Sequence, residues 1–432
     1  MEQVKVAKGD SYARVKAACY MTNVSMSVVS NLSPLLFIIF RSQFGLSYSL
    51  LGLLVLINFC TQLIVDLIFS FFSHKFNIAK TVKITPILAV IGLVIYALFP
   101  YFLPHLAYLG IVIGTVIFSA AGGLVEVLIS PVIAAIPADD PDKEISKLHS
   151  VYAWGVVGVV LFGTLFLLLF GASSWTWLTL LFAIIPLVAT MLYQGANIPK
   201  IKTPAKTSGA ISFLKNKGVW LCFFAIFFGG ASECIMAQWS SGYIEQALGI
   251  PKVWGDVFGV TLFSLALGLG RTIYSKKGKN ICKVLLLGAI GACACYLVAA
   301  LSPIPIIALI ACALTGFCVS MLWPGSLIVS SDRYAAGGVF IFALMAAGGD
   351  FGASVGPQLV GVVSDLAITS SSVASLAATV GLNVEQLAMK IGMLTGVIFP
   401  LLAVLAFSLL YRGEKKKKGL LPPLKQEDEV EK

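Results

Sequence analysis

The chain has 432 residues, of which 58% are hydrophobic and only 12% are charged. A soluble domain carries about 25% charged residues, so this composition excludes an ordinary soluble protein. The net charge of +10 does not indicate nucleic-acid binding, because the basic residues fall in short loops and tails and form no basic domain.

Long apolar runs recur along the chain, and each approaches the roughly 20 residues that cross a bilayer. The runs are continuous and do not alternate with period two, which favours helices over barrel strands. The sequence therefore predicts an all-α membrane protein of two pseudo-symmetric six-helix bundles. Its twelve transmembrane helices are expected near residues 15–40, 48–73, 82–102, 106–136, 147–170, 174–193, 218–247, 254–274, 281–301, 304–330, 335–366 and 389–411.

A polar stretch with five lysines divides the chain in the middle. The expected organisation is a cytoplasmic N-terminal tail at 1–14, a bundle at 15–193, a cytoplasmic linker at 194–217, a bundle at 218–411 and a cytoplasmic tail at 412–432. The two bundles echo one another, since Gly123 precedes Pro131 by eight residues in span 4 and Gly316 precedes Pro324 by eight in span 10. Parallel six-helix repeats are one known transporter architecture.

The basic residues predict the orientation. With the N-terminus inside, 27 of the 30 Lys and Arg residues are cytoplasmic, and only Arg41, Lys252 and Lys390 lie outside. This asymmetry follows the positive-inside rule, so we expect a multi-pass protein of the cell inner membrane with both termini cytoplasmic. The Ser-rich stretch 369–375 is expected to be the longest external loop, and Asn383 with Gln386 three residues later predicts the start of a helix.

Polar residues inside the apolar spans are the candidates for function. A charge at mid-membrane costs about 2.5–3.5 kcal/mol even on the lenient insertion scale, so it normally faces a cavity or a partner. Spans 3, 6, 9 and 12 have no carboxylate in their interiors, which predicts that the other spans surround a path. The candidate substrate-binding residues are Asn23, Asn31, Asn58, Gln62, His149, Trp154, Glu233, Gln238, Trp239 and Trp323.

The candidate proton-coupling residues are Glu126, Asp66 and Asp350. Structural roles stay open at several positions. Asp66 could anchor a gate, Asp350 could hold spans 2 and 11 together, and the tryptophans could be ordinary packing residues. We expect no catalytic residues, and the nine cysteines are interpreted as free thiols without a metal site.

Several stretches resemble the major facilitator superfamily. Its signature between spans 2 and 3 is similar to residues 70–80, where Lys75 and Lys80 keep the basic positions and Asn77 can replace a glycine, although Ser70 and His74 depart from it. The second copy resembles residues 270–279. Within the superfamily, the chain looks most like the fucose-permease-like branch of sugar:proton symporters, at 122–126, 230–233 and 323–325. The resemblance implies a coupling carboxylate at Glu126; the first span offers Asn23 and Asn31 where that branch has its other carboxylate.

The leading hypothesis is a secondary transporter of a small polar solute, a sugar before others, driven by protons through alternating access. Desolvation favours the neutral form of a carboxyl group, so a carboxylate in a dry cavity can load and release a proton. The alternative is a proton-driven efflux carrier for amphipathic compounds. An intramembrane enzyme or sensor is disfavoured because no catalytic set or soluble domain appears. The expected partners are the solute, protons and the lipid bilayer, without cofactor or nucleic acid, and the expected state is a monomer.

Overall fold

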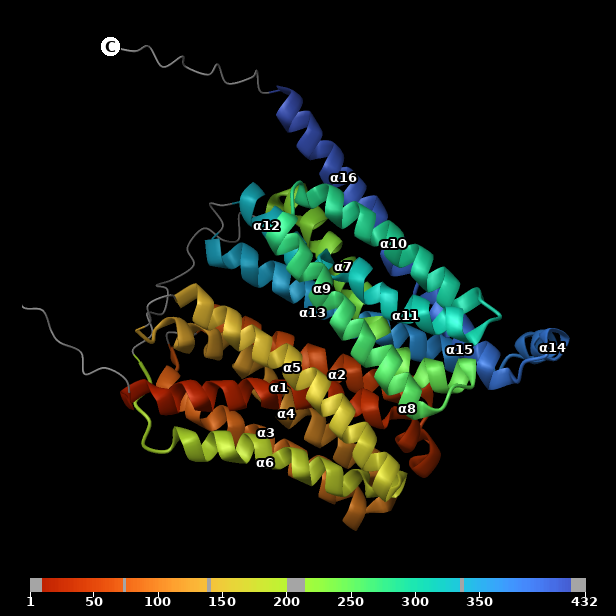
Figure 1. The fold of residues 1–432 in the computed structure, drawn as a ribbon, viewed down its shortest axis with the longest axis horizontal. Helices are drawn as coiled ribbons and strands as arrows, with labels where there is room; N and C mark the ends of the chain where they lie inside the picture. Colours follow the sequence, from red (N-terminus) through yellow and green to blue (C-terminus); the bar gives the residue numbers. More distant parts are fainter. Residues whose placement is uncertain (1–9, 73–74, 138–140, 200–213, 335–337, 421–432) are drawn as a thin grey trace, which may run out of the picture.

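The computed structural model describes residues 10–72, 75–137, 141–199, 214–334 and 338–420. Within these residues, 12 helices are long and apolar enough to cross a membrane. They lie side by side in one bundle (Figure 1), and the described residues contain no strand. The predicted all-α fold with twelve membrane-spanning helices is therefore confirmed, while the domain boundaries drawn at the tails and the linker stay a prediction.

The first six spans are single helices, packed together on one side of the molecule (Figure 1). Short 3-10 turns at Pro104–Leu106 (η2) and Ala172–Ser174 (η3) lead into the fourth and the sixth. The helices are α1 (Asp10–Phe44), α2 (Tyr48–Phe72), α3 (Ile78–Phe102), α4 (Ala107–Ala134), α5 (Pro141–Phe170) and α6 (Trp175–Tyr193). Of these, α1, α3 and α5 begin or end a few residues beyond the predicted spans.

The second six spans lie on the other side, and three of them are interrupted (Figure 1). Span 8 contains one π-helical stretch, and spans 10 and 12 each consist of two helices. The elements are α7 (Lys217–Leu248), α8 (Lys252–Trp254), η5 (Gly255–Thr261), α9 (Leu262–Lys277), α10 (Ile281–Leu301), α11 (Pro305–Val319), α12 (Leu322–Arg333), α13 (Gly338–Ile368), α14 (Ser371–Val380), α15 (Val384–Thr395) and α16 (Ile398–Leu420).

The loop between α13 and α15 is more ordered than the sequence analysis expected. The sequence predicts a loop at 369–375, but α14 begins at Ser371 and ends at Val380, and Gly381 caps it in a left-handed conformation with φ 70°. The predicted helix start at Asn383 is confirmed. The Asn383 side chain accepts from the Gln386 N–H, and the Gln386 side chain accepts from the Asn383 N–H, which is a capping box.

The two ends of the bundle differ in how the halves meet. We call the end where α6 stops and α7 begins the linker end, and the opposite end, with Phe44 and Tyr48, the far end. The main apolar core runs through both halves and joins them, for example where Phe37 of α1 meets Trp239 of α7. A second core lies nearer the linker end and is built from the first half alone, including Val15, Leu128 and Tyr193.

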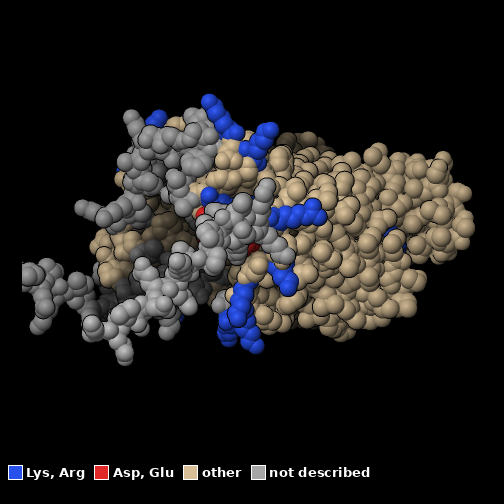
Figure 2. Space-filling model, turned by 90° about the horizontal axis from the view of Figure 1, so that it is seen from above, with Lys and Arg blue, Asp and Glu red and all other residues tan. Residues whose placement is uncertain are grey.

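The third helix of each triplet carries a row of exposed apolar side chains, as its greasy sequence predicts. These rows are Ile84, Ile87 and Ile91 on α3, Leu181, Ile184 and Leu187 on α6, Leu287, Ile290 and Leu297 on α10, and Leu401, Leu405 and Leu409 on α16. Lys and Arg gather toward one end of the molecule, and most of the remaining visible surface is free of charge (Figure 2). An apolar girdle with charge at one end suits a helix bundle in lipid.

Candidate functional site

Three carboxylates from three helices meet between the halves. Asp66 on α2, Glu126 on α4 and Asp350 on α13 each offer one oxygen, and these oxygens all lie within 4.8 Å of one another. Asp350 is only 3% exposed, Asp66 is half-buried and Glu126 is exposed. We call these three residues the acidic triad. The structure thus brings together all three predicted proton-coupling residues, and their coupling role stays a prediction.

The acidic triad is electrostatically costly if fully charged. Two unit charges 4.8 Å apart repel by about 3.5 kcal/mol at an effective dielectric constant of 20, and three such pairs are present. Water around the exposed Glu126 reduces its share of this energy. One carboxylate oxygen of Asp66 (Oδ1) and one of Asp350 (Oδ2) are buried without a hydrogen-bond partner among the described residues. The triad therefore needs positive charge, either as protons or as a bound cation.

A second charged group lies at mid-depth in the other half. Arg271 on α9 donates from Nη2 to Glu233 Oε1 of α7 at 3.2 Å and from Nε to the Ser320 carbonyl at 3.0 Å. Pro324 explains the second bond. The N–H four residues after Ser320 would normally donate to that carbonyl within the helix, but Pro324 has no N–H. The carbonyl is freed where α11 gives way to α12, and Arg271 satisfies it.

Glu233 and Arg271 both have spare bonding capacity. The Oε2 atom of Glu233 is buried without a described partner. The Arg271 side chain is 44% exposed, and its guanidinium has five N–H donors, only two of which these bonds use. The α13 helix, which carries Asp350, packs against both α2, which carries Asp66, and α7, which carries Glu233.

The four predicted asparagine and glutamine ligands of the first half form bonds inside that half. Asn58 Oδ1 accepts from Gln62 Nε2 at 3.0 Å and from Ser119 Oγ at 2.6 Å, and all three side chains are buried. Asn23 Nδ2 donates to the Leu148 carbonyl at 2.6 Å, and Asn31 Nδ2 donates to the carbonyl of Ser27 at 2.9 Å. These bonds tie α2 to α4 and α1 to α5, so in this conformation they support the walls of the region between the halves.

The predicted tryptophans differ in what they can offer a solute. Trp239 is fully buried, donates from Nε1 to the Pro357 carbonyl at 2.9 Å and packs on Phe37, so its ring has no free face in this conformation. Trp323 fits against Gly230 and Gly349, where an added methyl group would collide with the indole. Trp154 is 70% exposed. Gln238 is buried, and the side chain of His149 lies outside the described residues.

A buried ion pair that the sequence analysis missed closes the far end on one side. Asp256 at the start of η5 is fully buried and pairs with Lys252 Nζ at 2.9 Å. It also accepts from Ser241 Oγ and, across the halves, from Thr164 Oγ1 of α5 at 2.7 Å. The spacing of four between Lys252 and Asp256 is the available sequence signal, because it places the two side chains on one helix face.

The other side of the far end is closed between α2 and α13–α15. Arg41 and the Tyr48 hydroxyl both donate to Glu385 Oε1 at 2.8 Å. The first backbone N–H groups of α2 donate to Asp365 on α13, from Tyr48 at 2.9 Å and from Ser49 at 2.6 Å. An acidic side chain at a helix N-terminus is stabilising. The halves are therefore clamped together at the far end, whereas Glu126, Trp154 and Arg271 remain exposed.

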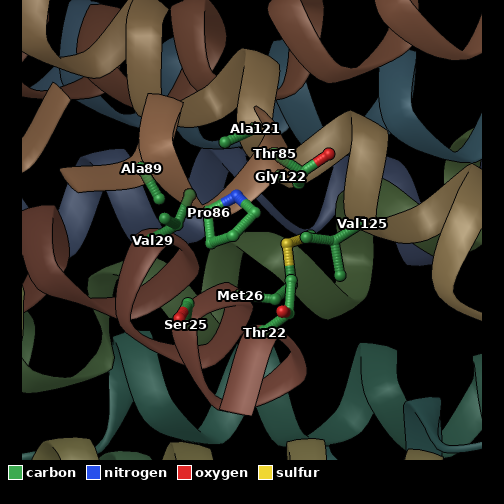
Figure 3. A pocket seen from close by; sticks show the side chains of 10 residues that line it. All are labelled: Thr22, Ser25, Met26, Val29, Thr85, Pro86, Ala89, Ala121, Gly122 and Val125. Atoms are coloured by element: carbon green, nitrogen blue, oxygen red, sulfur yellow. The ribbon is translucent and has the colours of Figure 1, made fainter. Parts of the chain in front are cut away.

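Two small cavities, each with room for about one water molecule, lie inside the bundle. The first lies within the first half, where Met26, Pro86 and Val125 of α1, α3 and α4 face one another (Figure 3). The second lies between the halves and is lined by Asn31, Pro34, Leu35, Val160, Ala237, Ser241, Asp256 and Val260. The second therefore lies beside the Asp256 interactions that close the far end.

Solved structures of the same fold are membrane transporters. A bacterial homologue of the human lysosomal transporter Spinster, in an inward-facing and occupied conformation, is 15% identical, with 97% of this chain and 100% of that chain covered and a TM-score of 0.69. The nucleoside transporter NupG is 13% identical, with 94% of this chain and 100% of that chain covered and a TM-score of 0.68. A variant of the E. coli fucose:proton symporter FucP is 16% identical, with 91% of this chain and 99% of that chain covered and a TM-score of 0.56. At these identities the likeness shows the fold alone.

No curated protein matches the chain in sequence. The family pattern described as Major Facilitator Superfamily matches residues 18–357, which is most of the chain. The twelve spans, the two halves and the solved structures agree with this match, and the protein is a membrane transporter and not an enzyme. The chain belongs to the Major Facilitator Superfamily.

Proposed function

We propose that the protein is a secondary active transporter of a small polar solute, with a sugar as the first candidate, driven by protons through alternating access. The acidic triad is the observation that carries this proposal. Its carboxylates come from both halves, and two of their oxygens are buried without partners. Intramembrane acids of this kind mark ion pathways.

We propose that the protein lies in the inner membrane of the cell. In the proposed orientation, the linker end faces the cytoplasm. The exposed basic residues Lys75, Lys80, Lys215, Lys276 and Lys279 surround the linker end. The three basic residues expected outside are all engaged by the protein. Arg41 pairs with Glu385, Lys252 pairs with Asp256, and Lys390 donates to the carbonyls of Ala300 and Ser302.

The coupling follows from where the carboxylates sit. Asp66 and Glu126 belong to the first half and Asp350 to the second, so a rocking motion of the halves changes the separation of like charges. Bringing the carboxylates closer favours proton uptake, and separating them favours proton release. Glu126 is exposed in this conformation and exchanges its proton with water on the linker side, while the far end is closed. The proton and the solute thus move in the same cycle.

The solute is proposed to bind beside Glu233 and Arg271, because that pair has an unpartnered carboxylate oxygen and unused N–H groups. Hydroxyl groups can both donate to Glu233 and accept from Arg271. Nucleosides and fucose, which the similar transporters NupG and FucP carry, are rich in hydroxyl groups. Trp154 offers an exposed aromatic face for the apolar side of a sugar ring.

The test is uptake of a panel of labelled sugars and nucleosides into proteoliposomes, with and without a proton gradient. Glu126→Gln mimics the neutral acid, so we expect it to abolish accumulation driven by protons while solute exchange between equilibrated compartments continues. Asp332→Asn, an exposed acid outside the triad, is the matched control. Accumulation by Glu126→Gln at the parent rate would exclude Glu126 as the coupling residue. Transport of amphipathic compounds without any sugar or nucleoside would favour an efflux carrier.

A further inference from the structure

The geometry of the acidic triad suits a metal ion. Its three oxygens lie within 4.8 Å of one another, so there is a point within about 2.8 Å of all three, close to the 2.3–2.6 Å of calcium–oxygen bonds. A contraction of a few tenths of an ångström on binding completes three bonds of ordinary length. Carboxylate oxygens are the preferred ligands of hard cations such as Ca²⁺ and Mn²⁺.

The state of Asp350 is a second observation that points to a ligand. Its side chain is 3% exposed, and its Oδ2 has no hydrogen-bond partner among the described residues, although it lies in the triad with Asp66 and Glu126. Buried polar atoms in folded proteins nearly always have a partner. Asp66 Oδ1 is unpartnered in the same way. Two carboxylates of one cluster therefore each have an oxygen available to bond to a positive partner.

We propose that Asp66, Glu126 and Asp350 bind a hard divalent cation between the two halves. The triad carries up to three negative charges, and a divalent ion neutralises more of this charge than a monovalent one. The exposed side of Glu126 provides the entry path, and water supplies the remaining ligands. The ion bridges α2 and α4 of the first half to α13 of the second, so its binding biases the arrangement of the halves. The inference deepens the proposed function by adding a ligand to the same compartment.

The experiment is a titration of the purified full-length protein in detergent with Mn²⁺, followed by the electron paramagnetic resonance signal of free Mn²⁺. We expect one Mn²⁺ per chain, displaced by Ca²⁺ and not by equimolar Na⁺. Asp350→Asn and Asp66→Asn should each weaken binding at least tenfold, and Asp332→Asn should leave it unchanged. Glu126→Gln is a further variant that an exposed position tolerates, so the outcome does not depend on folding of the buried variants.

Absence of Mn²⁺ binding at millimolar concentration, or equal binding by the parent and the triad variants, would overturn the inference. Displacement by equimolar Na⁺ would overturn the assignment to a divalent ion. Proton-driven uptake in the presence of a chelator separates this inference from the proposed function. If proton-driven uptake persists and no Mn²⁺ binds, the proposed transport function holds and the metal site is wrong. If Mn²⁺ binds and no proton-driven uptake occurs, the metal site holds and the proposed transport function is wrong.

Discussion

Gly361 of α13 is the position where a single methyl group should open the far end. An alanine methyl there would lie 2.9 Å from the Tyr48 carbonyl carbon and 3.3 Å from Ser49 N, and it would also overlap the Tyr48 carbonyl oxygen. These are backbone atoms of α2, so no side chain can move aside. The helices must separate, and the separation pulls Tyr48 N and Ser49 N away from Asp365, one turn along α13.

The magnitude follows from the bonds that are lost. A hydrogen bond to a charged group contributes about 1.5–3 kcal/mol. Loss of about 2 kcal/mol from the closed far end corresponds to a roughly 30-fold shift of the equilibrium toward the opened one. Gly158→Ala on α5 is the matched control, because nothing lies within 4 Å of its added methyl group.

The assay is the rate at which a membrane-impermeant maleimide labels Asn31→Cys in a cysteine-free background, with the far end facing the reagent. Asn31 lines the cavity below the far-end closure. We expect a labelling rate about 30-fold higher with Gly361→Ala and no change with Gly158→Ala. A Gly361→Ala protein that folds normally and is labelled at the parent rate would refute the closure described between α2 and α13.

Three further predictions test the topology, the second closure and the solute site. A thiol introduced at Ser173 should be labelled from outside the cell and one at Lys215 only from inside, and the reverse pattern would overturn the orientation. Thr164→Val removes the bond to Asp256 across the halves, so the Asn31→Cys labelling rate should rise about tenfold. The control is Thr190→Val, because the Thr190 hydroxyl bonds within its own helix. If Thr164→Val and the parent are labelled at the same rate, this bond does not hold the far end closed. Arg271→Lys keeps the positive charge, but a lysine lacks the planar guanidinium that bonds to both Ser320 and Glu233. Solute uptake should therefore fall at least tenfold. Uptake at the parent rate would show that Arg271 does not bind the solute.

The number of spans and the lipid-facing helices could be predicted from the sequence because both depend on local hydropathy. The members of the acidic triad could also be named, since each is a carboxylate within an apolar run. A contact between spans 2 and 11 through Asp350 was one of the roles left open in the sequence analysis. The meeting of all three carboxylates in one cluster could not be predicted, because the acids are far apart along the chain and only the folded bundle brings them together.

Residues predicted to bind solute at four-residue spacing illustrate a different limit. Asn58 and Gln62 lie one above the other on α2, and that spacing also lets them bond to each other, as they do here. A polar stripe therefore indicates a polar environment without saying whether protein or solute supplies the partner. The Lys252–Asp256 pair was missed for a different reason. The predicted span 8 starts at residue 254, so Lys252 was assigned to the loop before that helix. In the structure α8 begins at Lys252 and the π-helical stretch η5 follows, which places Lys252 and Asp256 in the same span.

Pro324 is a residue whose effect on the candidate site follows directly from its chemistry. Because it has no N–H, the Ser320 carbonyl is left without its helical partner in the middle of an apolar span. An unsatisfied carbonyl at that depth is costly, and Arg271 satisfies it at 3.0 Å. The same bond fixes the guanidinium beside Glu233, with other N–H groups left for a ligand. Pro324 thus positions a cation on α9, the neighbour of span 10, whereas α4 continues through the corresponding Pro131 as one helix.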